Sequence, residues 1–462
     1  MRFMKSSQLF VATTLVAAGC GNLTDDTTSV ISAVIGDRLP GLQGDSDLLA
    51  EASAAFSTFE DANDGLGPIF NAQACGQCHT NGAIGGAGEQ IERRFGRFDN
   101  GAFNPLGNEG GSLRQLFTLG QFTGLNNQSC NVPLEREPAD ATVRNVGRLT
   151  TPTFGLGLVD AMPDSFFDGL VAAEPTAQRG TVNRGQIVLP NPGDPSQSVG
   201  ATRVTRFGWK AGVPSMIQFS ADAYVNEMGI TTQSCFRGAA VTGFAVESAP
   251  SGVPVSAFCD DRAPRQVGTS PGGGLTATQW SQVDDAVGSC AGSRTEIQDD
   301  VFLFAVFMTS LAPAPRDLSD QISVTQGQPL FSQVGCNNCH ATATFRTPAN
   351  PAPVSIDAAG SETVRVPGNF AFNPYSDFAV HDMGSLGDRI GNAGDSVAVT
   401  QRMRTAPLWG LRFRNHLLHD GRCGDVVCAV QAHDGQAAAA RNAFNALSSA
   451  NQHNIVQFVR SL

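Results

Sequence analysis

The sequence has 462 residues, of which 41% are hydrophobic, and this length suggests about two to four domains. It carries 30 lysines and arginines against 42 aspartates and glutamates, and the net charge of −12 disfavours nucleic acid as a partner. Only 16% of the residues are charged, whereas 51 are glycine and 25 are proline. We therefore expect a mainly α fold, in which short helices are joined by long loops.

The N-terminal segment is predicted to direct export. Two basic residues precede a mostly apolar stretch, 9–18, which is too short to span a bilayer. The letters "LVAAGC" that end this segment resemble a bacterial lipobox, which predicts a signal peptide over 1–19, lipidation at Cys20 and a polar tether over 20–45. We expect an exported lipoprotein, periplasmic or anchored to the outer membrane, that meets the membrane through its lipid anchor only. The alternative is an ordinary secretory signal in which Cys20 is incidental.

A haem-attachment motif follows at residues 75–79. Cys75, Cys78 and His79 form the pattern Cys-x-x-Cys-His, whose thiols can add to the vinyl groups of a c-type haem while the histidine binds the iron. A zinc site would need four nitrogen or sulfur ligands, and a thioredoxin-like motif favours a βαβ setting, so both alternatives fit less well. His79 is the only histidine before His340, so the first half has no histidine for the other face of this iron.

The first half also carries additional material. Residues 180–208 alternate apolar and polar residues around Pro/Gly turns, which predicts a β-hairpin. Residues 231–275 are rich in Gly, Pro and Ser and contain two cysteines. We expect this second segment to be a disulfide-pinned insertion with little helix.

The chain has 11 cysteines, and six remain after Cys20 and four haem thiols are set aside. An even remainder in an exported protein indicates disulfides. Cys423 and Cys428 close a short loop and form the pair that we expect first. The other four allow three pairings, among which the sequence does not choose: Cys130, Cys235, Cys259 and Cys290.

The second half repeats landmarks of the first. A second motif, Cys336, Cys339 and His340, follows the letters "GQPLFSQVG", which resemble "GPIFNAQA" before the first motif. "RLTTPTFGLGL" is matched by "RTAPLWGLRF", and apolar helices are predicted to close the two halves over 299–313 and 454–462. Three landmarks in one order predict two covalently bound c-type haems in two cytochrome c-like domains. These domains are expected over 46–315, which includes the insertion, and 316–462.

The ligand on the far face of each iron decides between electron carrier and catalyst, because two strong ligands close the iron to substrate. The second half offers five histidines as candidates: His381, His416, His419, His433 and His453. The first half offers none, so its haem is expected to differ from its partner.

Three stretches resemble a known family. They are "RFGWKAGVPSMIQFSADAYVNEMGITT", "HDMGSLGDR" and "APLWGLRFRNHLLHDGR". All three are similar to the bacterial di-haem oxidoreductase (putative peroxidase) family, and more distantly to di-haem cytochrome c peroxidases and to the di-haem enzyme that matures methylamine dehydrogenase. The resemblance covers most of residues 50–462.

The resemblance implies roles for three residues. In the peroxidases a tryptophan lies between the haems, and a glutamine and a glutamate line the peroxide-binding face; these match Trp209, Gln218 and Glu227. The carboxylate can move a proton between the peroxide oxygens, the amide can orient the peroxide, and the indole can pass an electron. Gln218 and Glu227 are nine residues apart, on opposite faces of a continuous helix, so the helix that begins near Pro214 must end before Glu227. The alternatives are core packing for Trp209 and a surface acid at Glu227.

The resemblance also implies the ligand of the second haem. In the peroxidases the far ligand follows the histidine of "HDG" by fourteen positions, and here His433 follows His419 by that distance. The alternatives are that His433 lies at the surface and that His419 or Met383 replaces it. The peroxidases also hold a calcium ion between their domains. Arg414 and His416, which are poor calcium ligands, stand at the corresponding positions, so calcium stays a doubtful possibility.

The resemblance implies an exported di-haem oxidoreductase. Hydrogen peroxide or another small oxidant would be reduced at the N-terminal haem, with electrons relayed through the C-terminal haem from a small redox protein. One alternative is oxidative modification of a protein or organic substrate by the same haem pair. Another is a plain electron-transfer cytochrome, which requires a sixth ligand on the first haem. The candidates for that ligand are Met162, Met216, Met228 and Lys210.

Overall fold

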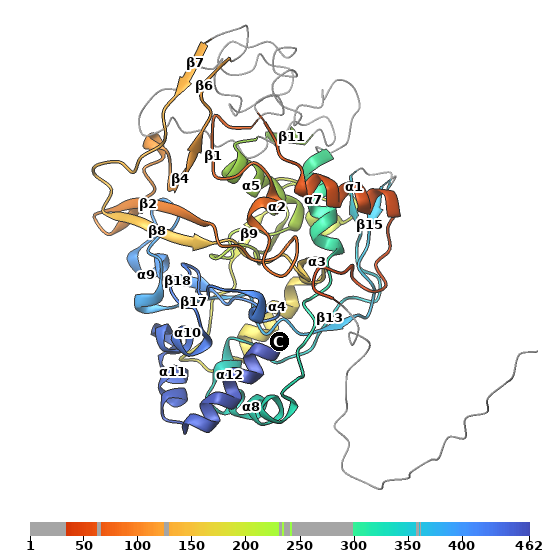
Figure 1. Ribbon diagram of the computed structural model, residues 1–462, viewed down its shortest axis with the longest axis vertical. Coiled ribbons are helices and arrows are strands. Elements are labelled where there is room, and N and C mark those ends of the chain that lie inside the picture. Colours follow the sequence, from red (N-terminus) through yellow and green to blue (C-terminus); the bar gives the residue numbers. More distant parts are fainter. Residues whose placement is uncertain are drawn as a thin grey trace, which may run out of the picture. The chain divides into compact units, whose positions relative to one another are not determined.

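The computed structural model describes residues 34–61, 66–123, 129–230, 233–234, 241–242, 299–356, 360 and 362–462 (Figure 1). Helix accounts for 34% and strand for 19% of the structure. The expected mainly α fold made of two cytochrome c-like domains is therefore wrong. Short antiparallel strand pairs occupy many of the segments that were expected to be loops, because a pair of two or three residues leaves little alternation in the sequence.

The largest sheet described has four strands. β2 (Ile91–Asp99) lies between β3 (Ala102–Asn104) and β4 (Leu113–Arg114), and β8 (Val143–Leu149) also pairs with β2. The register of the β2–β8 pair breaks near the middle of β2, where Phe95 is fully buried. Arginines and a glutamate fill much of β2, which conceals its strand pattern.

The remaining described strands form two-stranded antiparallel pairs. The hairpin predicted over 180–208 is confirmed by the pairing of β9 with β10. The pairs are β1 (Ile69–Phe70) with β5 (Phe117–Thr118), β6 (Gly120–Thr123) with β7 (Ser129–Val132), β9 (Arg184–Gln186) with β10 (Thr202–Val204), β11 (Gln233–Ser234) with β12 (Val241–Thr242), β13 (Phe345–Arg346) with β16 (Ala371–Phe372), β14 (Val354–Ser355) with β15 (Thr363–Val364), and β17 (Val380–Asp382) with β18 (Arg402–Arg404).

The helices are mostly short and polar-capped at their N-termini. The α-helices are α1 (Ser46–Ser57), α2 (Cys75–Cys78), α3 (Leu156–Asp160), α4 (Asp164–Ala173), α5 (Met216–Ala223), α7 (Asp299–Ser310), α8 (Gln321–Gln333), α9 (Val397–Thr400), α10 (Val426–Ala432), α11 (Ala438–Asn445) and α12 (Ser449–Ser461). A π-helix, η4 (Tyr224–Met228), continues α5. Single 3₁₀ turns are η1 (Gly107–Glu109), η3 (Pro195–Gln197), η8 (Cys336–Asn338), η9 (Gly384–Leu386), η10 (Leu411–Phe413) and η11 (Gly435–Ala437).

The two predicted closing helices are confirmed. α7 is apolar on all sides because it packs against both α1 and α5, and α12 packs against α8 (Figure 1). Gly327 permits the close approach of α8 to α12, since a Cβ at this position would lie 2.0 Å from the carbonyl oxygen of Asn454. This contact explains the glycine in the second haem-motif landmark.

Two large hydrophobic clusters form the core. The first surrounds α7 and also includes Phe345 and Trp409 from the second half of the chain. The second consists of residues between Val324 and Leu462. The first cluster therefore crosses residue 315, and the domain boundary proposed there stays a prediction.

The predicted signal peptide and Cys20 lie outside the described residues. Most of the predicted insertion over 231–275 also lies outside them. The described end of the predicted tether packs on the body of the protein, because Leu39 is 2% exposed and Arg38 pairs with Leu311. Among the described residues, no helix is long and apolar enough to cross a membrane.

Candidate functional site

The cysteines separate into two groups. Cys423 and Cys428 form a disulfide, which confirms the predicted pair. Cys130 is also disulfide-bonded, with a partner outside the described residues. Among the described cysteines, the free thiols are those of the two haem motifs: Cys75, Cys78, Cys336 and Cys339.

The first motif opens onto a cavity of about 750 Å³. Its cysteines lie at the two ends of the single turn α2, so that both thiols and His79 line the cavity. The Nδ1 atom of His79 lies 3.0 Å from the carbonyl oxygen of Gly86, which leaves Nε2 for a metal. Burial lowers the pKa of His79 to about 4, so the imidazole is neutral, as a metal ligand must be. The thiols, the imidazole and the cavity fit a haem.

A carboxyl group faces the same cavity from η4. Glu227 lines the cavity, and Asn71 Nδ2 donates a hydrogen bond to its Oε2 atom at 2.9 Å. Burial, followed by the charge of Glu92, raises the pKa of Glu227 to about 8. The raised pKa favours the protonated form of the Glu227 carboxyl group at neutral pH.

The wall around Glu227 contains further charged groups that the sequence did not identify. Arg94 pairs with Glu92 through two hydrogen bonds of 2.6 and 3.2 Å, and burial raises the pKa of Asp222 to about 6. Phe95 follows Glu92 and Arg94 on β2 and is buried in the core. Arg93 stands between Glu92 and Arg94, so no alternation of charged and apolar residues marks this wall in the sequence, and the cavity depends on tertiary folding.

Gln218 and Glu227 do not meet. α5 ends at Ala223, before Glu227 as expected, but the chain continues as the π-helix η4 rather than leaving the helix. The backbone N–H of Val188 donates to Gln218 Oε1 at 3.1 Å, so this amide contacts the β9–β10 hairpin. Gln218 is absent from the residues that line the first cavity, and Glu227 is present.

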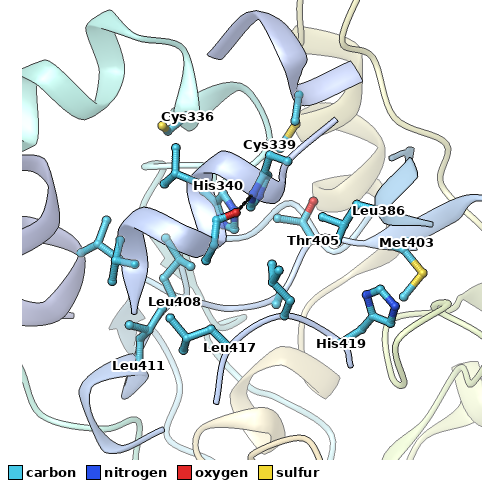
Figure 2. A pocket seen from close by; sticks show the side chains of 18 of the residues that line it. Cys336, Cys339, His340, Leu386, Met403, Thr405, Leu408, Leu411, Leu417 and His419 are labelled. Atoms are coloured by element: carbon cyan, nitrogen blue, oxygen red, sulfur yellow. Dashed lines mark hydrogen bonds between the residues drawn. The ribbon is translucent and has the colours of Figure 1, made fainter. Parts of the chain in front are cut away.

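The second motif opens onto a mainly apolar cavity. Figure 2 shows Cys336, Cys339 and His340 near its upper edge, with Leu408, Leu411 and Leu417 on one side and Leu386, Met403 and His419 on the other. The labelled apolar side chains are Leu386, Leu408, Leu411 and Leu417. A haem macrocycle is a flat apolar body, so this lining fits it.

Two imidazoles face each other across the second cavity. The ring centroids of His340 and His433 are 6.5 Å apart. Two imidazole nitrogens that bind one metal ion from opposite sides lie about 4 Å apart, because each metal–nitrogen bond is about 2 Å long. The distances from the two nitrogens to their ring centroids together add roughly 2 Å, which gives a separation close to the observed one. Each Nδ1 lies near a carbonyl oxygen, of Tyr375 at 3.0 Å and of Ala429 at 2.6 Å, so each Nε2 remains for the metal. Burial lowers the pKa of both rings.

The other candidate ligands of the second half lie in different environments. His419 and Met383 line the second cavity, and burial lowers the pKa of His419 to about 4. His381 Nε2 lies 2.9 Å from a carboxylate oxygen of Asp377. His416 and His453 are exposed, and of these two only His416 lines the second cavity. The sequence assigned no role to His381. In the structure its side chain forms a buried ion pair with Asp377.

Trp209 lies where the two cavities meet, since it lines both. Its indole N–H donates to the carbonyl oxygen of Leu149 at 2.8 Å. The neighbouring Lys210 ammonium donates to Asp388 at 2.9 Å and to two backbone carbonyls. Asp388 also accepts from Arg148, and these two cations hold its pKa well below its usual range. Lys210 is thus held in an ion-pair network.

The methionines considered as sixth ligands divide into two groups. Met228 lines the first cavity, as does Met308, which the sequence reasoning did not include. Met162 and Met216 are buried in the first hydrophobic cluster and are not among the lining residues. A thioether ligand for the iron that His79 would bind would therefore come from Met228 or Met308.

Comparisons with known proteins identify the family. No curated protein matches the chain. Among solved structures, the chain is similar to Kuenenia stuttgartiensis hydrazine synthase pressurised with xenon, at 12% identity over 99% of this chain and 100% of that chain. The TM-score of 0.37 is too low for an argument about the fold. A family model described as "Di-haem oxidoreductase, putative peroxidase" matches residues 126–462, which is most of the chain. The chain therefore belongs to this di-haem oxidoreductase family.

Proposed function

We propose that the protein is an exported c-type di-haem oxidoreductase that reduces hydrogen peroxide. The observation that carries the proposal is the difference between the two cavities. Two imidazoles, of His340 and His433, face each other in the second cavity, whereas the imidazole of His79 shares the first cavity with the protonated carboxyl group of Glu227. The membership of the di-haem oxidoreductase family supports the same chemistry.

The four free motif thiols would attach the two haems through thioether bonds. His79 would bind one iron, and His340 and His433 would bind the other from both faces. When bound, the haems supply electrons and, on the side of His79, a coordination position for a peroxide oxygen. The "LVAAGC" stretch supports lipidation at Cys20 and a periplasmic or outer-membrane-anchored location.

Glu227 is proposed to be the proton-transfer residue. Cleavage of the peroxide bond requires a proton on the departing oxygen, and the Glu227 carboxyl group can donate it. The hydrogen bond from Asn71 fixes Oε2, and the neighbouring Glu92 keeps the pKa high. Gln218 is left out of the proposed mechanism, because its amide is hydrogen-bonded to the β9–β10 hairpin.

Trp209 is proposed to connect the two haems. A small redox protein would deliver electrons at the second haem, and the indole lies at the junction of the two cavities. An aromatic ring that can be oxidised shortens the distance that an electron must cross in one step. The hydrogen bond to Leu149 holds the ring in one orientation.

A ferric spectrum with a peroxide titration tests the proposal. We expect one low-spin species with two histidine ligands and one species that changes when peroxide is added. The Glu227→Gln variant should keep both ferric spectra and react far more slowly. Two fully low-spin haems and no reaction with peroxide would contradict the proposed function.

Electron transfer without catalysis is the second candidate. Met228 and Met308 line the first cavity, and either thioether could close the iron held by His79. Low-temperature EPR of the ferric protein separates the two functions. A low-spin histidine–methionine signal from the first haem favours the electron carrier, and a high-spin signal favours the peroxidase.

A further inference from the structure

Two arginines share the lining of the second cavity with Trp209. Arg404 is 7% exposed, and Arg414 is half-buried. Both Arg404 and Arg414 line the second cavity, and both also line a small adjoining pocket that includes Trp209. The proposed peroxidase mechanism uses neither residue.

The hydrogen bonds of Arg414 leave part of its guanidinium unmatched. The NH2 group donates to the carbonyl oxygens of Pro407 at 3.1 Å and Trp409 at 3.2 Å. The Nε–H group is buried and has no hydrogen-bond partner among the described residues. A buried charged donor without a partner is costly, and native structures seldom retain one unless something else satisfies it.

Arg404 has a related environment. Its Nε donates to the carbonyl oxygen of Gly208 at 2.7 Å, and one terminal nitrogen donates to the carbonyl oxygen of Thr405. The guanidinium also lies over the ring of Phe378, 5.6 Å from its centroid. These neighbours are carbonyls and a ring, which orient the group but do not neutralise its charge.

The positive charges of Arg404 and Arg414 are poorly neutralised by acidic groups among the described residues. Burial lowers the pKa of both arginines to about 10, and the charge of Arg414 lowers that of Arg404 further. Asp377 acts in the opposite direction on Arg404, whereas burial alone shifts the pKa of Arg414. Among the described residues, neither arginine forms an ion pair, and a guanidinium is best matched by a carboxylate.

The position of the pair indicates where that carboxylate comes from. The rest of the cavity lining includes the leucines shown in Figure 2, so the two arginines are charged groups in a mainly apolar wall. A haem has the same division, since its macrocycle is apolar and its two propionate carboxylates lie on one edge. A free small carboxylate would satisfy the same donors, and experiment distinguishes the two sources.

We propose that Arg404 and Arg414 bind a propionate carboxylate of the second haem, at the edge that faces Trp209. The inference rests on the proposed attachment of that haem at Cys336, Cys339 and His340. Paired cations at this edge stabilise the reduced, more negative form of the haem. Arg404 and Arg414 are positioning residues that set the reduction potential of the haem.

The test uses the full holoprotein and three variants. Arg414→Gln removes the positive charge, and Arg414→Lys keeps the charge but loses the planar guanidinium with its paired donors. Arg460→Gln makes the same charge change at an exposed position on α12. Spectroelectrochemical titration gives the potential of the second haem, and resonance Raman spectroscopy gives the bending band of its propionates.

We expect Arg414→Gln to shift the ferric-to-ferrous ratio at fixed potential about tenfold toward the ferric form, which is 59 mV for one electron. Its propionate band should also shift. Arg414→Lys should fall between this variant and the wild type, and Arg460→Gln should leave both readouts unchanged. If Arg414→Gln does not fold, the same readouts on Arg404→Gln decide the matter.

Two outcomes would overturn the inference. One is a potential and a propionate band that are the same in Arg414→Gln and Arg460→Gln. The other is an unchanged band together with a saturable effect of added acetate on the wild-type spectrum, which would assign the site to a free anion. The wild-type EPR signal of the histidine–histidine haem is the separate check. Its absence contradicts the proposed function, whereas its presence with an unchanged band contradicts this inference alone.

Discussion

The indole nitrogen of Trp209 donates to the carbonyl oxygen of Leu149 at 2.8 Å, and the amide of Leu149 donates in turn to the carbonyl oxygen of His419 at 2.6 Å. Trp209 lines both cavities, and His419 lines the second. These two hydrogen bonds connect the indole with the strand β8 and with the loop that precedes α10. Trp209 is therefore bonded to a residue of β8 that is itself bonded to the loop carrying His419.

Replacing Trp209 by phenylalanine should slow electron transfer between the haems. The smaller ring keeps the site apolar but removes the indole N–H, so the carbonyl oxygen of Leu149 loses a partner and the free energy of unfolding falls by about 1 kcal/mol. Rapid-mixing reduction should show the second haem reduced at the wild-type rate and the first more slowly. Trp280→Phe provides a matched control elsewhere in the chain. If the first haem is reduced as fast in Trp209→Phe as in the wild type, the proposed role of the indole is contradicted.

Removing the proton of Glu227 should reduce peroxide turnover. We expect Glu227→Gln to lower kcat/KM for peroxide by about 10²- to 10⁴-fold, the usual contribution of a general acid or base. Because the pKa of Glu227 is raised to about 8, wild-type activity should decline above that pH. Glu51→Gln, at an exposed position on α1, is the control. A wild-type rate in Glu227→Gln would remove this residue from the mechanism.

The same carboxyl group should make the stability depend on pH. The folded protein holds a proton on Glu227 up to pH about 8, whereas a glutamate in the unfolded chain, whose ordinary pKa is 4.5, releases it much earlier. The folded state therefore binds more protons across this window, so the free energy of unfolding should fall as the pH rises through it. Urea titrations at several pH values should show a smaller fall in Glu227→Gln. Part of the fall should remain, because burial also raises the pKa of Glu174 to about 8. Parallel curves for the two proteins would contradict this assignment.

The features that the sequence predicted correctly are local ones. The disulfide between Cys423 and Cys428 and the β9–β10 hairpin depend on residues close together in the chain. Glu227 was found through the family resemblance, but its partner Asn71 lies 156 positions away and has no motif of its own. The resemblance also suggested Gln218, whose side chain the β9–β10 hairpin engages instead.

The prediction of a mainly α fold was wrong for a related reason. β2 and β8 are separated by more than forty residues, and their pairing forms the wall that carries Glu92 and Arg94. Charged residues on both strands reduce the apolar alternation by which strands are recognised. Glu92 and Arg94 line the first cavity and are charged, so this wall is poorly predicted from hydrophobic periodicity.

Removing His433 should open the second haem. His433 follows α10, whose N-cap Asp425 accepts a hydrogen bond from the amide of Cys428 at 2.8 Å, so the disulfide and the cap together fix the helix that presents the imidazole. In His433→Ala the iron loses one nitrogen ligand, and the low-spin EPR signal of this haem should give way to a high-spin signal. Added imidazole should restore the low-spin form, since the space of the missing ring is available.

The control for this variant is His453→Ala, which removes an exposed histidine of α12 that does not line the second cavity. Its EPR spectrum should match the wild type. A low-spin signal that persists in His433→Ala would mean that another residue lining the same cavity, a histidine such as His419 or the thioether of Met383, binds the iron instead. The two are distinguishable, because a thioether ligand raises the reduction potential relative to a second imidazole. The geometry favours His433, whose Nδ1 is turned toward the carbonyl of Ala429 and whose ring faces that of His340 at the separation of two ligands on one metal.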